Sequence, residues 1–316
     1  MRGLEIARAF YEEWGIPMLR EQFPELLPYV AAGLVGSGSE CYGFDDALSR
    51  DHDFEPGFCL FLPGEDVVDR RTAFRLERAY ARLPREYAGL RRALMAPVGG
   101  SRHGVMRISE FFEEKVGAAD GALTLKQWMT LPSHVLADAT NGAVFCDPYG
   151  VFTEIRTRLS HLPAEVRRKK LAGHLLIMAQ AGQYNYKRCL AHGETGAAQL
   201  AVIEFVQSAL QATFLLNDRH MPYYKWSFRA MRALPLLSDL ADTLEFLISS
   251  DNDSATCATK GEIIEDIAGI FIRTLQEQAL TDATCGDLSK HAYSVNDSIT
   301  DAALRNMNIF AGAQHI

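Results

Sequence analysis

The sequence has few cysteines, and none of them stands in a pair that commonly holds a metal. Six cysteines are scattered over the 316 residues, and no C-x-x-C motif occurs. Structural zinc and a disulfide framework are therefore not expected. Cys59 lies in an apolar run and is predicted to be a small buried side chain. This use of cysteine favours a reducing, cytoplasmic location.

The chain also lacks long apolar runs and an excess of positive charge. No uninterrupted run of the roughly 18 apolar residues that span a bilayer occurs, and no signal-peptide core is expected at the N-terminus. We therefore expect no membrane partner. The formal net charge of −8 argues against an extensive nucleic-acid surface, although it leaves room for a local basic pocket.

What the sequence does contain is an ordinary globular composition whose pattern changes midway. Hydrophobic residues make up 48% and charged residues 23%, which is ordinary for a globular protein, and 316 residues allow one large domain or two medium ones. The first half mixes helical and extended patterns. Helices are predicted over residues 3–30, 66–93 and 124–136 and after Ser109 as N-cap, and extended segments over 58–62, 104–108 and 142–150. Residues 30–35 fit a strand or a helix end.

From about residue 163 helical periodicity dominates. Helices are predicted to start at Pro163 and to cover 200–216, 261–280 and 295–310. The nearly continuous apolar stretch 200–216 fits a helix buried in a bundle, or a dimer interface. We therefore predict an α+β fold, with a mixed sheet and flanking helices in residues 1–160 and a C-terminal α-helical bundle in 161–316. The oligomeric state stays open.

A small-residue turn followed by two spaced carboxylates is the most informative feature. Gly36-Ser37-Gly38-Ser39 precedes Asp51-His52-Asp53. On a strand, Asp51 and Asp53 would project from the same face, because side chains alternate with a period of two. Two such charges favour a cation between them, and Mg²⁺ commonly uses one or two carboxylates plus substrate phosphates. A solvated acidic turn is the alternative interpretation.

These residues resemble a known signature. Gly36-Ser37 with Asp51-His52-Asp53-Phe54 resembles the nucleotidyltransferase (polymerase β-like) superfamily. The longer string, with Gly43-Phe44-Asp45-Asp46 and Ser49-Arg50 between, is similar to the uncharacterised bacterial family DUF4037, which is commonly described as nucleotidyltransferase-like. The resemblance implies a nucleotidyltransferase-like fold, in which Asp51 and Asp53 are the catalytic, metal-binding carboxylates. Gly36, Ser37 and, more weakly, Ser39 would bind the nucleotide phosphates.

The sequence departs from the superfamily pattern at the third carboxylate. Many members carry one on a neighbouring strand, but the expected strand 104–108 offers only Val105, Met106 and Arg107 in its interior. Glu110 and Asp147 are weak substitutes. The departure leaves open a protein that binds nucleotide without transferring it.

Two aromatic–basic groups stand out in the helical half. Gln180, Tyr184, Lys187 and Arg188 follow at i, i+4, i+7 and i+8, which predicts a shared helix face. Tyr184, Lys187 and Arg188 are candidates for stacking a base or neutralising phosphates, with an exposed polar face as the alternative. The second group, Tyr223-Tyr224-Lys225-Trp226, could line a cleft or form an interhelical contact.

The function expected from the resemblance is Mg²⁺-dependent transfer of a nucleoside monophosphate, AMP from ATP, to a hydroxyl of a small molecule or protein. The chain would then be an enzyme of the nucleotidyltransferase class, with a nucleoside triphosphate as substrate. The alternative is a catalytically weak or inactive nucleotide-binding regulatory module of the same fold.

Overall fold

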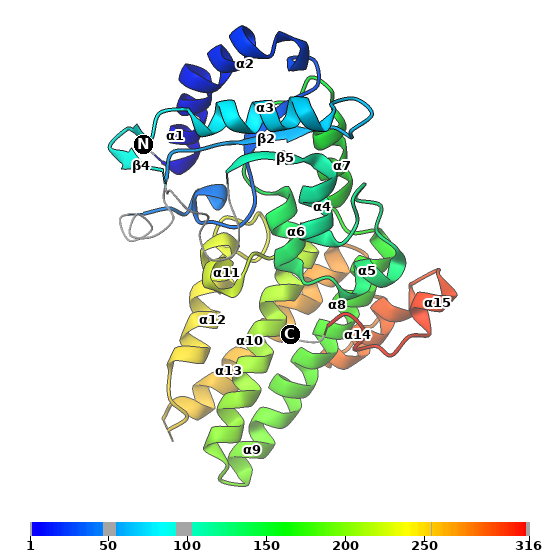
Figure 1. Ribbon diagram of the computed structural model, residues 1–316. Helices are drawn as coiled ribbons and strands as arrows, with labels where there is room; N and C mark the ends of the chain where they lie inside the picture. The colour runs from blue at the N-terminus through cyan, green and yellow to red at the C-terminus, as the bar shows by residue number, and fades with distance from the viewer. Residues whose placement is uncertain (1, 47–54, 93–102, 254, 314–316) are drawn as a thin grey trace. The chain divides into compact units, whose positions relative to one another are not determined.

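The computed structural model describes residues 2–46, 55–92, 103–253 and 255–313 (Figure 1). Contacts within the chain define two compact units. The first comprises Met1–Leu123 and Val135–Ser160, and the second Thr124–His134 and His161–Ile316. The sequence-based division at residue 160 placed 124–134 in the N-terminal half, whereas this segment makes its contacts within the helical unit.

The first unit is built on a four-stranded mixed sheet. Its strands are β1 (Ala31–Leu34), β2 (Cys59–Leu62), β5 (Gly104–Arg107) and β6 (Ala143–Cys146), in the order β5-β2-β1-β6. β1 pairs antiparallel with both β2 and β6, and β2 pairs parallel with β5. Both central strands are buried along their whole length, which explains why their sequences read as continuous apolar runs.

Helices cover both faces of this sheet. They are α1 (Gly3–Phe10), the π-helical turn η1 (Tyr11–Gly15), α2 (Ile16–Gln22), α3 (Arg70–Ala81), α4 (Ile108–Val116), α6 (Ser133–Thr140) and α7 (Val151–Leu159), with short 3₁₀ turns at Pro24–Leu26 and Glu40–Tyr42. Leu60 and Leu62 pack in one core cluster with α1, α2 and α3. Phe61 points the other way and stacks on Phe152 of α7, with ring centroids 4.0 Å apart.

Three local predictions for residues 66–140 were wrong in detail. The helix predicted over 66–93 ends at Ala81, and a hairpin of β3 (Glu86–Tyr87) and β4 (Leu90–Arg91) follows. Its turn uses Ala88 and Gly89, both with positive φ, a geometry that suits a tight hairpin. The helix predicted over 124–136 is two helices, because Pro132 separates α5 (Leu125–Thr130) from α6. Arg107, rather than Ser109, is the N-cap of α4.

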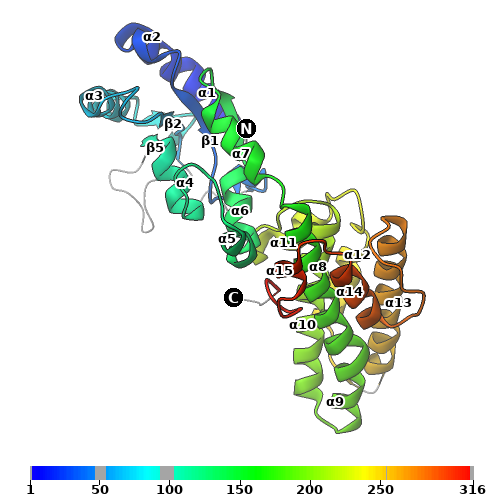
Figure 2. The ribbon, with the colours of Figure 1, turned by 90° about the vertical axis from the view of Figure 1, so that its right-hand side faces the viewer.

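The second unit is a helical bundle. α8 (Ala164–Met178) continues through a π-helical stretch, η5 (Ala179–Tyr186), into α9 (Lys187–Ala191). The remaining helices are α10 (Thr195–Leu216), α11 (Tyr224–Met231), α12 (Leu240–Ser249), α13 (Thr256–Glu277), α14 (Leu288–Asp297) and α15 (Ala302–Arg305). Figure 2 shows α8 and α10 running side by side within this unit. The helix predicted over 295–310 was wrong, since α14 ends at Asp297 and α15 starts anew behind its cap Asp301.

The apolar stretch 200–216 lies in the centre of this bundle. α10 has 22 residues and an apolar window with a mean hydropathy of 1.3, so by length and composition alone it could cross a membrane. In the fold, 67% of that window is buried, and Phe205, Ala209 and Ala212 are inaccessible to solvent. The prediction of a buried helix is confirmed.

Three lysines are buried in the helical unit. The Lys169 ammonium donates to the Asn296 side chain (2.7 Å) and to the carbonyls of Arg305 (3.3 Å) and Met307 (2.7 Å). Lys260 donates to the carbonyl of Ser250 at 2.6 Å and to two side-chain amide oxygens at 3.1 Å. Lys170 has one hydrogen bond, to the Leu131 carbonyl at 3.3 Å, and burial lowers its pKa to about 8. The first two lysines therefore hold loops to the bundle. The cost of burying the charge of Lys170 is poorly compensated by its hydrogen bonding.

Candidate functional site

The Gly-Ser turn follows directly after β1. Gly36 and Gly38 have φ values of +107° and +144°, which residues other than glycine rarely adopt. Because Gly33 of β1 lies opposite Cys59 of the antiparallel β2, the turn leaves the sheet at the end where β2 begins. Asp51 and Asp53, predicted to bind the metal, lie outside the described residues, and β2 begins six residues after Asp53 in the sequence.

One side chain from a distant part of the chain holds this turn. The Asn141 amide oxygen accepts from the Gly36 N–H at 2.9 Å, and the amide nitrogen donates to the Gly36 carbonyl at 2.7 Å. The next residue, Gly142, donates its N–H to the Cys41 carbonyl at 2.9 Å. Both backbone groups of the buried Gly36 are thus satisfied by Asn141, which fixes the position of the turn.

Arg156 fixes Asn141 in turn. Its guanidinium, on α7, donates to the carbonyls of Ala139 (3.2 Å), Thr140 (2.9 Å) and Asn141 (2.6 Å), which end α6 without helical partners. Burial lowers the pKa of Arg156 to about 10, so the side chain stays charged at neutral pH. The end of α6, the turn and α7 therefore form one hydrogen-bonded assembly.

A carboxylate that the sequence analysis missed contacts Ser37. The Ser37 hydroxyl donates to Asp138 Oδ2 at 2.8 Å, and the Tyr42 hydroxyl donates to Asp138 Oδ1. Burial, and next the negative charge of Asp138, raise the pKa of Tyr42 well above its ordinary value. Asp138 lies in α6, 101 residues after Ser37, so no local sequence motif predicts this contact. Ser37 would have to give up this bond to donate to a phosphate.

A lysine lies beside the same turn. A Cβ placed on Gly36 would come 3.9 Å from Lys115 Cε of α4, and the Lys115 ammonium pairs with Glu114 at 3.1 Å. Burial raises the pKa of the Cys59 thiol to about 12, whereas the positive charge of Lys115 lowers this pKa, so Lys115 also lies near Cys59. Lys115 therefore supplies positive charge near both the turn and the start of β2, where an anion would need it.

The other carboxylates considered from sequence serve as helix caps or turn partners. Glu110 accepts from the Arg107 N–H at 3.0 Å, and Asp147 accepts from the N–H groups of Gly150 (3.0 Å) and Thr153 (2.7 Å). The Ser39 carbonyl accepts from the N–H groups of Tyr42 (3.2 Å) and Phe44 (2.8 Å). These contacts support local structure, and the roles predicted for Glu110, Asp147 and Ser39 at the site stay predictions.

No metal centre is formed by the described part of the chain alone. Within residues 2–46, 55–92, 103–253 and 255–313, no group of three or more His, Cys, Asp or Glu side chains could hold an ion. The predicted Mg²⁺ site at the Gly-Ser turn therefore depends on Asp51 and Asp53, which lie outside the described residues.

In the helical unit the predicted face of η5 and α9 is divided between two grooves. Arg188 lies over the Tyr184 ring, 5.0 Å from its centroid, and Tyr184 is 59% exposed. Lys187 instead faces α13 and pairs with Glu265 at 2.8 Å. The π-helical stretch that ends at Tyr186 shifts the register of side chains, so spacings that coincide on an α-helix diverge here.

The two grooves differ in chemistry. One, of about 550 Å³, lies between η5 and the start of α14 and is lined by Gln180, Tyr184 and Tyr293 among others. The other, of about 450 Å³, lies between α9 and α13 and contains Lys187 with Glu262, Glu265 and Asp266. Burial raises the pKa of Glu265, but hydrogen bonds from Lys187 and Gln183 outweigh it and lower the pKa overall. This acidic lining disfavours a triphosphate at Lys187.

The second aromatic–basic group lies on the surface of the helical unit, at the start of α11. The rings of Tyr223 and Tyr224 are 4.3 Å apart, and the two side chains are 49% and 72% exposed. Tyr223 also meets His134 edge-on at 5.6 Å, and Lys225 lies 5.0 Å from the Trp226 ring centre. The group is therefore accessible to a ligand as well as engaged in local contacts.

The fold defines a mostly helical protein with a small mixed four-stranded sheet near the N-terminus and a helical C-terminal region. Residues 128–227 match the family model described as Domain of unknown function (DUF4037), so the chain carries a DUF4037 domain there. The match includes Asp138, Asn141 and Arg156 but not the Gly-Ser turn. No curated protein and no solved structure matches the chain.

Proposed function

We propose that the protein transfers a nucleotidyl group, AMP from ATP, to a hydroxyl of a small molecule or protein. The observation that carries the proposal is the Gly36-Ser37 turn, which has the cation Lys115 beside it and the carboxylate Asp138 bonded to it. A nucleotide phosphate needs positive charge and backbone or hydroxyl donors, and the transfer needs carboxylates. The resemblance of the string from Gly36 to Phe54 to the nucleotidyltransferase superfamily points to the same chemistry.

The reaction assigns a task to each of these groups. The acceptor oxygen attacks the α-phosphorus and forms a new P–O bond, while the bond from that phosphorus to the bridging oxygen of the β-phosphate breaks. Pyrophosphate leaves with the bonding electrons, and the hydroxyl proton passes to a carboxylate, for which Asp138 is the candidate. Lys115 would neutralise phosphate charge. Mg²⁺ held by Asp51 and Asp53 would neutralise the triphosphate further.

A second candidate is a nucleotide-binding module without transfer activity. Its support is β5, whose Val105 and Met106 bring no carboxylate and whose Arg107 donates to the carbonyls of Pro63 (2.6 Å) and Val68 (2.7 Å). Such a module would bind a nucleoside triphosphate at the same turn but release no pyrophosphate.

Thermal unfolding with ATP, GTP, CTP and UTP, each with and without Mg²⁺, tests the site. A nucleotide at 100 times its Kd should stabilise the protein by about 2.7 kcal/mol. Asp51→Asn/Asp53→Asn should abolish the Mg²⁺-dependent part of this shift, and Lys115→Met should weaken it. Asp66→Asn/Asp297→Asn removes the same charge at exposed positions and should leave the shift unchanged.

Pyrophosphate release then separates the two candidates. Release from ATP that stops with Asp138→Asn, in a protein that still binds ATP, supports transfer with Asp138 as the base. Binding without release supports the nucleotide-binding module. No shift with any nucleotide in the wild-type protein argues against both.

A further inference from the structure

One segment of this acidic chain carries a local excess of positive charge. Residues 70–92 contain eight arginines, no lysine and only two acidic residues, a net charge of +6. Because the whole chain carries −8, the remaining residues carry −14. A positively charged segment in a negatively charged protein creates a strong local electrostatic field, which favours a polyanionic partner.

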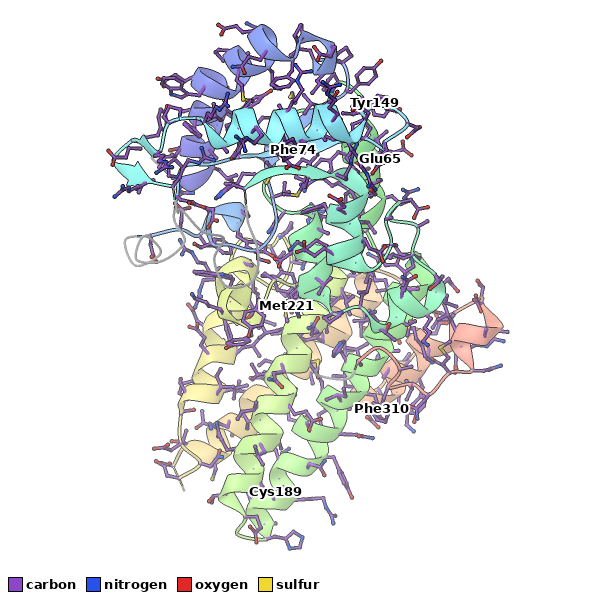
Figure 3. All side chains as sticks on the ribbon, in the orientation of Figure 1. Glu65, Phe74, Tyr149, Cys189, Met221 and Phe310 are labelled. Carbon is purple, nitrogen blue, oxygen red and sulfur yellow. The ribbon has the colours of Figure 1, made fainter. Side chains whose placement is uncertain are left out.

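Much of this charge lies on the outer face of α3. The inner face, with Ala73, Leu76, Ala79 and Tyr80, is buried against the sheet. The outer face presents Arg71, Phe74, Arg78 and Arg82 at i, i+3, i+7 and i+11, which places them in one row along the helix. Figure 3 shows Phe74 on α3, and its side chain is 59% exposed.

The arginines of this row are available for a ligand. Neighbouring arginines are engaged, since Arg70 pairs with Glu65 at 2.7 Å and Arg92 lies over the Tyr80 ring at 4.7 Å. In contrast, Arg71, Arg78 and Arg82 form no ion pair with any acidic side chain that the structure describes. Three guanidinium groups that form no ion pair within the described part of the chain thus flank an exposed aromatic ring.

We propose that the row Arg71–Phe74–Arg78–Arg82 binds a single-stranded polynucleotide. Guanidinium groups bond phosphates in a bidentate manner and also stack on bases, and an exposed aromatic ring accepts an unstacked base of any sequence. The row is short and local, so it accords with an otherwise acidic surface. It is independent of nucleotide transfer at the Gly-Ser turn.

An acidic protein fits this face less well. A protein interface needs an apolar core that is depleted of charge, with a polar rim around it. The outer face of α3 offers one large apolar side chain, Phe74, with arginines on three neighbouring positions and Glu77 on its other flank. One ring is enough to stack a base but too little for the core of a protein interface.

Fluorescence anisotropy with labelled single-stranded RNA and DNA of the same mixed sequence tests the proposal. With three phosphates neutralised, a fourfold rise in salt should weaken binding by about 20-fold. Phe74→Ala should weaken it about tenfold, while Phe74→Trp should restore it. Arg71→Gln/Arg78→Gln/Arg82→Gln should remove both binding and its salt dependence.

The control is Lys126→Gln/Arg273→Gln/Lys290→Gln, which removes three exposed positive charges from the helical unit. It should leave affinity within twofold of the wild type. The proposal is overturned if neither strand binds, if the control weakens binding as much as the α3 triple variant, or if polyglutamate of equal charge competes as well as the oligonucleotide does. That last outcome would assign the face to acidic proteins.

Discussion

The Asn141 amide should be the principal hydrogen-bond anchor of the Gly-Ser turn. It bonds both the N–H and the carbonyl of Gly36, at 2.9 and 2.7 Å. Gly36 is buried, so a lost partner leaves an unsatisfied backbone group, which costs about 1–3 kcal/mol each. Asn141→Ala loses both bonds and should lower the free energy of unfolding by about 2–6 kcal/mol. Asn141→Asp keeps the acceptor, loses the donor and should cost about half as much.

Urea unfolding of the three proteins measures this series, with the midpoint and the slope fitted separately. The same variants should lose nucleotide-dependent thermal stabilisation in the same order, because the turn is the proposed phosphate site. The reasoning fails if Asn141→Ala and Asn141→Asp are both within about 0.5 kcal/mol of the wild type, a range typical of surface substitutions.

Three further substitutions test the packing and the charges. Burial lowers the pKa of Lys170 from 10.5 to about 8, so the unfolded chain binds this proton more tightly and stability should rise as pH increases from 8 to 10.5. Lys170→Met should therefore stabilise the protein by about 1–3 kcal/mol at pH 7, with the gain shrinking as the pH rises from about 8 to 10.5; destabilisation at pH 7 would contradict this. Lys260→Met should instead cost about 1–3 kcal/mol in urea unfolding, because it leaves the Ser250 carbonyl without its donor. The side-chain oxygens of Gln199 and Asn252 keep a second donor each. Gly142→Ala places a Cβ 2.1 Å from the Leu34 carbonyl oxygen and should cost about 2 kcal/mol or more in urea unfolding. Its control is Gly150→Ala, which also has a positive φ but lies in open space and should cost only about 1 kcal/mol.

Much of the fold could be predicted from the sequence because its signals are local. The apolar runs that became β1, β2 and β6 are bounded by glycine or proline, and the strand at 104–107 starts at a glycine. The helix 195–216 is apolar on nearly all sides, which is compatible only with burial in a large core or a membrane. Where prediction failed, a single breaker such as Pro132 or a two-residue turn such as Ala88-Gly89 interrupted a pattern that otherwise read as helix.

The candidate site also has a part that local sequence predicts and a part that depends on tertiary contacts. The sequence by itself determined the glycine turn, the order of mixed sheet and helical bundle, and the arginine content of α3, since each depends on neighbouring residues. Only the tertiary structure decided that Asp138, Asn141 and Lys115 meet this turn, because they come from helices and loops far along the chain. A helical period shows which face of an element is buried but does not identify its partner. The π-helical register that separates Lys187 from Tyr184 likewise arises from packing rather than from spacing.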